Sequence, residues 1–199
     1  MVRRQIGPTK YILYRHKLNR FRDAAPGNPN GMSSSCAADV IAYLESQLIA
    51  VVASSSPDGQ PQASTVFYWI NDREGNRFNF YFVTRKTTRK YNNILQNPKV
   101  AVVVGTAFEP NTVQIDGIAE QLEADLSLKN LKNFSRFMTR HRIQAMIYDG
   151  AFYPKSPFKG IEGKEFVVFR VKPTRVAITS YDGITKNIVR RELDMASWQ

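Results

Sequence analysis

Apolar residues in this chain come mostly as short alternating or continuous runs, which is the pattern of β-strands. In residues 77–84 a phenylalanine recurs at every second position, so one face of this segment is expected to lie in a core. Residues 48–54 and 62–70 flank the turn sequence Ser56-Pro57-Asp58-Gly59 and predict an antiparallel hairpin. Later strands are predicted at residues 99–105, 112–122, 165–171, 176–181 and 186–191, with a bulge at Gly117 and turns at Pro173 and Asp182-Gly183.

Few segments between these strands have apolar residues at helical spacing. Residues 36–47 predict a first helix with Ser35 as its N-cap, and residues 128–138 predict a later one. The connection at residues 148–164 is rich in glycine and proline and is long for a compact domain, which is typical of a lid or binding loop. Hairpins separated by few helices argue against a parallel sheet. The predicted fold is therefore mainly β, a six-stranded antiparallel barrel with peripheral helices.

A basic segment lies between the strands predicted at 77–84 and 99–105. Thr87 or Thr88 can cap a short helix there, and Asn97-Pro98 ends it. A helix start at this place points unpaired N–H groups and the positive end of the helix dipole outward, which favours an anion such as a phosphate. The alternative is a basic loop that only faces solvent. The cations concerned are Arg85, Lys86, Arg89 and Lys90, and the apolar positions of the helix are Tyr91, Ile94 and Leu95.

Composition narrows the class of protein. A length of 199 residues fits one domain, and we expect residues 1–35 to form a basic, partly flexible arm ahead of a domain of residues 36–199. The arm holds seven Lys/Arg and one Asp, so it carries six of the eleven net positive charges. No apolar run reaches the length of a membrane helix. One cysteine and two histidines leave no Cys/His cluster for a metal and indicate a cytoplasmic protein without disulfides.

Three explanations of the arm stay open. Its aromatic and basic residues interleave, which suits nucleic acid, although packing on a partner subunit explains the arm better and we do not expect a nucleic-acid partner. Its Arg-rich, acid-poor composition also fits an organelle transit peptide.

In the order of its motifs the chain resembles the FMN-binding split-barrel family typified by pyridoxamine 5′-phosphate oxidase, over roughly residues 36–180. Each matching piece is common by itself, and their order and spacing carry the resemblance. The pieces are residues 61–66 (PQASTV), 82–84 (FVT), 88–90 (TRK), 97–101 (NPKVA) and 115–120 (IDGIAE).

The resemblance implies a homodimer with an FMN between the subunits. Backbone groups of the second strand would line the flavin ring, with Phe67, Tyr68 and Trp69 as candidate walls. The end of the third strand would reach the ring edge or ribityl chain, and the Arg-Lys pair would hold the phosphate. Arg85 or Lys86 would replace the basic residue that the family often has at the Ser64 position. The implied cofactor-binding residues are Ser64, Thr65, Val66, Phe67, Val83, Thr84, Arg85, Thr88, Arg89 and Lys90, with Thr112 and Gln114 serving the cofactor of the other subunit.

The chain departs from the family near its C-terminus. The enzyme that forms pyridoxal phosphate and the haem-degrading relatives both depend on a histidine there, and this chain has none after His141, so neither activity is expected. Arg190 and Arg191 lie in this region, but no histidine accompanies them. The expected function is an FMN-dependent oxidoreductase acting on an unidentified small molecule, with no catalytic side chain assigned. A deazaflavin-dependent reductase on the same fold and a flavin-binding module without turnover stay as alternatives.

Overall fold

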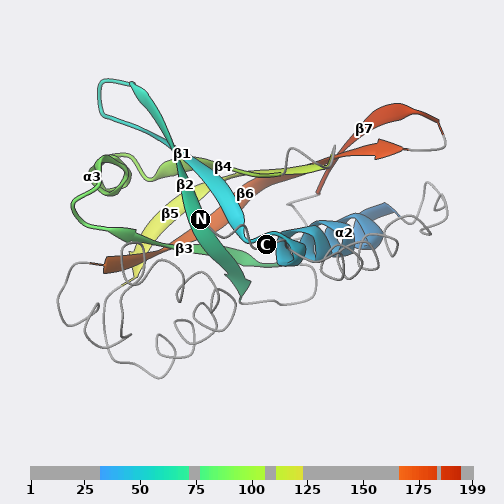
Figure 1. The fold of residues 1–199 in the computed structure, drawn as a ribbon, viewed down its shortest axis with the longest axis horizontal. Coiled ribbons are helices and arrows are strands. Elements are labelled where there is room, and N and C mark those ends of the chain that lie inside the picture. The colour runs from blue at the N-terminus through green and yellow to red at the C-terminus, as the bar shows by residue number, and fades with distance from the viewer. Residues whose placement is uncertain (1–31, 72–76, 106–110, 123–165, 183–184, 194–199) are drawn as a thin grey trace, which may run out of the picture. The chain divides into compact units, whose positions relative to one another are not determined.

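The structure is a computed structural model that describes residues 32–71, 77–105, 111–122, 166–182 and 185–193. The chain divides into two units, Met1–Met32 and Ser33–Gln199, and the described residues belong almost wholly to the second. No helix within the described ranges is both long and apolar enough to cross a membrane. The elements, labelled in Figure 1, are α2 (Met32–Ser46), β1 (Ile49–Ser55), β2 (Pro61–Asn71), β3 (Asn79–Arg85), α3 (Arg89–Gln96), β4 (Lys99–Gly105), β5 (Thr112–Leu122), β6 (Phe166–Asp182) and β7 (Asn187–Glu192).

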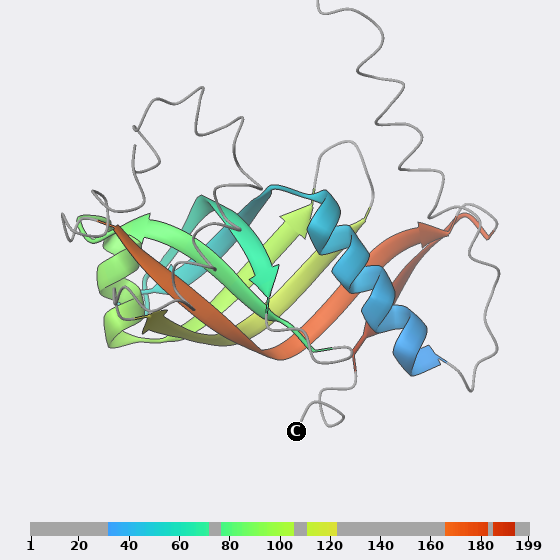
Figure 2. The same cartoon turned by 90° about the horizontal axis from the view of Figure 1, so that it is seen from below.

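Strands β1 to β6 close into an antiparallel barrel. The sheet order is β3-β2-β1-β4-β5-β6-β7, and a further pairing between β3 and β6 closes the ring. This confirms the predicted six-stranded antiparallel barrel. Strand β7 pairs with the last part of β6, and the two form a hairpin that extends beyond the closed ring in both views (Figures 1 and 2).

Helix α2 begins earlier than the sequence pattern predicted. It starts at Met32, so Ser35 lies inside the helix and is not its N-cap. Val40 and Leu44 are fully buried and join the barrel core. The guanidinium of Arg191 on β7 binds the carboxylate of Asp39 at 3.2 Å and ties the helix to the hairpin.

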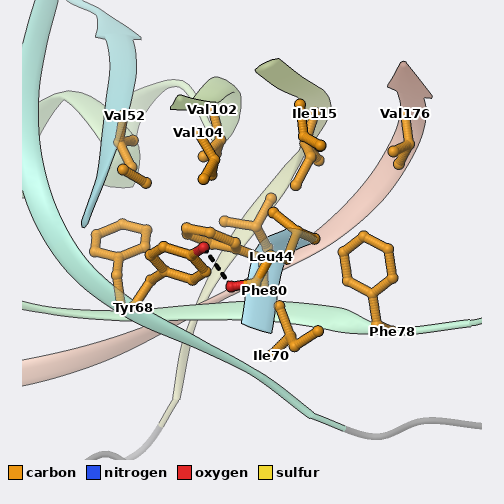
Figure 3. Packing of buried hydrophobic residues seen from close by; sticks show 14 of the residues in the cluster. Leu44, Val52, Tyr68, Ile70, Phe78, Phe80, Val102, Val104, Ile115 and Val176 are labelled. Atoms are coloured by element: carbon orange, nitrogen blue, oxygen red, sulfur yellow. Dashed lines mark hydrogen bonds between the residues drawn. The ribbon is translucent and has the colours of Figure 1, made fainter. Parts of the chain in front are cut away.

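The core is made of aliphatic side chains on one side and aromatic rings on the other (Figure 3). Val52, Val102 and Val104 face the rings of Tyr68 and Phe80, which stack with their centroids 4.6 Å apart. The hydroxyl of Tyr68 donates to the backbone oxygen of Leu44 at 2.6 Å, so this buried polar group is satisfied. Tyr68, one of the three candidate flavin walls, is therefore a core residue.

Strand β6 corrects the prediction of two strands separated by a turn at Pro173. It runs without a break for 17 residues. Gly117 of β5 pairs with Pro173 while Asp116 pairs with Arg175, so the strand register shifts there. A proline, which has no N–H donor, is tolerated at such a bulge. Gly117 is needed because a Cβ atom would lie 2.6 Å from the backbone oxygen of Lys172. The predicted bulge at Gly117 is confirmed.

Other predicted features fall outside the described residues. They are the arm at 1–31, the helix at 128–138 and the long connection at 148–164. The division into an arm of residues 1–35 and a domain of residues 36–199 stays a prediction.

Candidate functional site

The turn after β3 is held by the side chain of Thr88. Its hydroxyl donates to the backbone oxygen of Arg85 at 2.9 Å and accepts from the backbone N–H of Tyr91 at 3.3 Å. The extended backbone of Thr88 makes it the N-cap of α3, one of the two caps that the sequence left open. Its hydroxyl also lies 3.2 Å from that of Thr84, a buried residue at the end of β3. The cap thereby joins the strand end to the helix start.

The first residues of α3 place two cations differently. Arg89 is exposed, whereas the side chain of Lys90 is only 6% exposed. The ammonium nitrogen of Lys90 lies 5.6 Å from the centroid of the Phe82 ring, a cation–π contact. Within the described ranges no carboxylate pairs with Lys90, and desolvation lowers its pKa to about 8. A buried ammonium group without an anionic partner is costly, and a bound anion would supply that partner.

The barrel is open where β2 and β3 part. Their pairing runs from Asn71↔Asn79 to Tyr68↔Phe82 and stops there. Beyond it, residues 64–67 of β2 pair with β1, and residues 83–85 of β3 pair with β6. We call these two facing segments the split. Strand edges that part in this way can offer backbone donors and acceptors to a ligand.

Helix α3 lies across the same end of the barrel as the split. The side-chain amide of Asn93 donates to Gln62 of β2 at 3.3 Å, and that of Asn97 donates to Ser55 of β1 at 2.9 Å. Ile94 is the buried apolar residue of the helix, whereas Leu95 is 53% exposed.

Ser64 supplies an unsatisfied polar atom next to this helix-covered end. Its Oγ is buried and, in the part of the chain that the structure describes, has no hydrogen-bond partner. A buried hydroxyl without a partner costs free energy, and such atoms in native proteins are rare. Together with Lys90, it is a second group in the split end whose bonding capacity is unused.

Next to the split, where β2 and β3 are still paired, two aromatic rings stack on the face opposite the core. Trp69 of β2 stacks on Tyr81 of β3 with ring centroids 5.2 Å apart, and Phe67 and Val83 pack against this pair. Phe67 and Val83 are both implied cofactor residues, and they belong to the two segments that part. The other implied residues of the strands lie beside them: Thr65 is exposed, and Val66 points into the core.

Arg85 is the last residue of β3 and precedes the turn that leads to α3. Its guanidinium carbon lies 5.1 Å from the centroid of the Phe166 ring on β6, the residue with which it pairs. Lys86 lies in the turn and is half-buried. The structure places Ser64, Arg85 and Lys90 near the end of the barrel where β2 and β3 part.

Thr112 and Gln114 lie on β5, three strands away from the split. Thr65 of β2 pairs with Val51 of β1, Val51 pairs with Val103 of β4, and Val103 pairs with Gln114. At about 4.8 Å between neighbouring strands, Gln114 lies roughly 14 Å from Thr65 around the barrel. The role of Thr112 and Gln114 in a cofactor site stays a prediction.

Arg190 is a residue near Gln114 that the sequence interpretation set aside. Its guanidinium donates to the side-chain oxygen of Gln114 at 2.9 Å. The sequence carried no local signal for this contact, because the two residues are 76 positions apart. No group of three or more His, Cys, Asp or Glu that could hold a metal ion occurs among the described residues.

The fold defines a class of protein, the split barrels, in which β2 and β3 part beside a short helix. Residues 38–180 match the pyridoxamine 5′-phosphate oxidase family. Because this match covers more than half of the chain, the chain belongs to that family. This confirms the resemblance stated from the sequence.

Individual relatives are distant. Pyridoxine/pyridoxamine 5′-phosphate oxidase of Nostoc sp. is 26% identical over 118 residues, which are 59% of this chain and 45% of that enzyme. The match thus spans less than half of the enzyme's length, and its activity is not transferred to this chain.

Solved structures show the same fold. One is a Clostridium acetobutylicum protein of the pyridoxinephosphate oxidase family related to general stress protein 26, with a TM-score of 0.56 and 13% identity over 82% of this chain and 98% of that one. Another is an FAD-binding protein from Mesorhizobium loti, with a TM-score of 0.53 and 18% identity over 71% of this chain and 90% of that one. At these identities the likeness concerns the fold alone.

Proposed function

We propose that this protein binds FMN at the split and acts as a flavin-dependent oxidoreductase. Lys90, Arg89 and the start of α3 would hold the phosphate, with Ser64 donating a further hydrogen bond. The strand edges at residues 64–67 and 83–85 would meet the polar edge of the flavin ring, and Phe67 and Val83 would contact its face. Membership of the pyridoxamine 5′-phosphate oxidase family supports a flavin-type cofactor.

The observation that carries the proposal is the buried ammonium group of Lys90 at a capped helix start, which has no carboxylate partner among the described residues. A phosphate monoester carries close to two negative charges at neutral pH, so it can restore the charge balance that burial removes. Ser64 Oγ, which has no hydrogen-bond partner among the described residues, would add a donor from the end of β2 that α3 contacts. A ligand that reaches both groups would use the bonding capacity of each.

The chemistry would come from the cofactor, since a flavin transfers electrons or hydride by itself. The residues of this chain would bind the phosphate, orient the ring through backbone contacts and keep water from one of its faces. No side chain of the described residues is assigned as an acid or base. The substrate is therefore proposed only as a small molecule that can exchange electrons with a flavin.

A homodimer is part of this proposal. The outer face of β1 and β4 exposes Ile49, Val51 and Val103, and Val51 pairs with Val103 across the two strands. Neighbouring exposed apolar residues on a sheet face are suited to contact with a second copy. In such a dimer Thr112 and Gln114 would serve the cofactor of the other subunit.

Titration of the protein with FMN tests the proposal, with flavin fluorescence as the readout. Lys90→Ala is expected to raise the dissociation constant about ten- to a hundredfold, because a charge-assisted contact contributes about 1.5 to 3 kcal/mol. Lys99→Ala removes an exposed lysine at the start of β4 and is the matched control, with no expected change. Unchanged flavin absorbance and fluorescence at micromolar FMN would refute FMN binding.

Mass spectrometry of the ligand released from the purified protein shows whether the bound cofactor is FMN or a deazaflavin. Reduction by nicotinamide cofactors, followed by reoxidation with candidate acceptors, separates an oxidoreductase from a flavin-binding module without turnover.

A further inference from the structure

Gln114 and Arg190 share the outer face of the sheet. Gln114 of β5 pairs with Ala177 of β6, and Thr179 of β6 pairs with Arg190 of β7. Residues opposite each other in an antiparallel pair point to one face, as do residues two positions apart along a strand. The cross-strand register therefore places both side chains on the same side of the sheet, one step apart.

The contact between them fixes the direction of the Gln114 amide. Arginine has only donors, so the group that it meets at 2.9 Å must be the amide oxygen of Gln114. The amide nitrogen, with its two N–H donors, is then the end that remains for other partners. Without Arg190, the amide could turn over and present its oxygen instead.

Arg190 is itself held in place by a chain of charged groups. Its Nε lies 3.5 Å from Glu192, and Glu192 also binds Arg175. Arg175 reaches back to Asp116 of β5 at 3.1 Å. Each pair is exposed and contributes little by itself, but linked pairs restrict the rotamers of all members.

The surroundings of Gln114 are apolar and exposed on both sides. Val103, its pairing partner on β4, is 41% exposed. On the other side, Tyr181 pairs with Ile188 at the hairpin, and their side chains are 46% and 74% exposed. Tyr181 and Ile188 share the face of Arg190, because they lie two positions along the same strands. This face is continuous with the Val51 and Val103 surface proposed above to contact a second copy.

We propose that Arg190 is a positioning residue that makes Gln114 a hydrogen-bond donor toward a carbonyl oxygen of the flavin ring bound by the other subunit. This inference rests on the proposed function, since it requires a flavin between two subunits. Reduction of a flavin adds negative charge to its ring, so a donor at a ring oxygen binds the reduced form more strongly than the oxidised form. Arg190 would thus raise the reduction potential of the cofactor without touching it.

The experiment measures the FMN dissociation constant and the midpoint potential of the bound flavin in Arg190→Ala, Gln114→Ala and the double variant. Arg190→Ala is expected to weaken binding of the reduced flavin about tenfold more than that of the oxidised flavin, which lowers the potential by about 30 mV for a two-electron couple. The double variant is expected to match Gln114→Ala alone, because Arg190 acts through that residue. Arg190→Lys, which can still donate to the amide oxygen, should restore most of the potential.

Arg191→Ala is the control for loss of charge, since Arg191 neighbours Arg190 but binds Asp39 of α2. It should leave the potential unchanged. Additive effects of Arg190→Ala and Gln114→Ala, or equal potentials in Arg190→Ala and the wild type, would overturn the inference while leaving FMN binding intact. A wild-type protein that does not bind FMN would instead refute the proposed function and this inference with it. The thermal midpoint of each variant shows whether it is folded.

Discussion

The two ends of the barrel differ in the pairing of β2 with β3 and in the polarity of the side chains that they bury. In the closed part, β2 and β3 remain paired and bury fully apolar layers, with Tyr68 stacked on Phe80 and Val104 fully buried across from them (Figure 3). At the α3 end the same two strands part, and Thr84 and Lys90 are buried instead.

This difference separates stability from binding. Apolar burial contributes about 25 cal/mol for each Å² removed from water, so the closed part stabilises the fold. At the α3 end, β2 and β3 lose their pairing, Lys90 is buried, and the hydroxyl of Ser64 has no hydrogen-bond partner among the described residues. The buried cation and the unsatisfied hydroxyl both oppose folding. Functional sites are commonly places where a fold accepts such costs. The comparison can be tested by changing each end separately.

The largest effect is expected from truncating the closed core. Phe80→Ala should lower the free energy of unfolding by about 3 to 5 kcal/mol, because the fully buried ring contacts Tyr68 and Phe82 and leaves a cavity. Denaturant unfolding monitored by circular dichroism measures it. Leu95→Ala, at an exposed position of α3, should change stability by less than about 0.5 kcal/mol. A loss below about 1 kcal/mol at Phe80 would mean that the closed part is not the stabilising region.

The opposite sign is expected at the split. Lys90→Met keeps the apolar stem and removes the buried charge, so the cofactor-free protein should gain about 1 to 3 kcal/mol of stability at pH 7. The same variant should lose FMN affinity, as is also expected for Lys90→Ala. Lys99→Met, which changes an exposed lysine, should alter neither quantity. If Lys90→Met destabilises the cofactor-free protein, the buried ammonium is not a cost of the site.

The pH dependence follows from the pKa of Lys90, about 8 in the folded protein against 10.5 for the free group. Between these values the unfolded chain holds a proton that the folded chain has released, so Lys90 increases the stability of the cofactor-free protein as pH rises from about 8 to 10.5. Binding of a phosphate favours the charged form, so FMN affinity should fall above pH 8, by up to about tenfold per pH unit. Titrations at several pH values measure both trends, and neither should appear in Lys90→Met.

The smallest effect concerns the cap between the two regions. Thr88→Ala removes the side-chain bond to the Tyr91 N–H and should cost about 1 kcal/mol, with faster hydrogen exchange in α3. Thr87→Ala, at an exposed turn position, is the control. Equal exchange rates in both variants would show that Thr88 does not cap the helix in solution.

Much of this architecture could be predicted from local pattern. Alternating phenylalanines and β-branched runs located the strands, and β4 and β5 have the predicted bounds. Thr88 and Asn97-Pro98 marked both ends of α3, because caps and proline act on their immediate neighbours. Those features depend on interactions within a few residues.

The error at Pro173 has a physical reason. The sequence indicated a turn there, because a proline has no N–H to donate within a strand, and only the register shift opposite Gly117 makes the proline acceptable. That outcome depends on residues distant in sequence.

The sequence by itself determined the strands, the helix start and the family, because local propensity and motif order are carried by neighbouring residues. Only the tertiary structure decided that β2 and β3 part at Tyr68 and Phe82, that Lys90 is buried without a carboxylate among the described residues, and that Arg190 meets Gln114. Burial and cross-strand register arise when the barrel closes, so no local pattern can encode them.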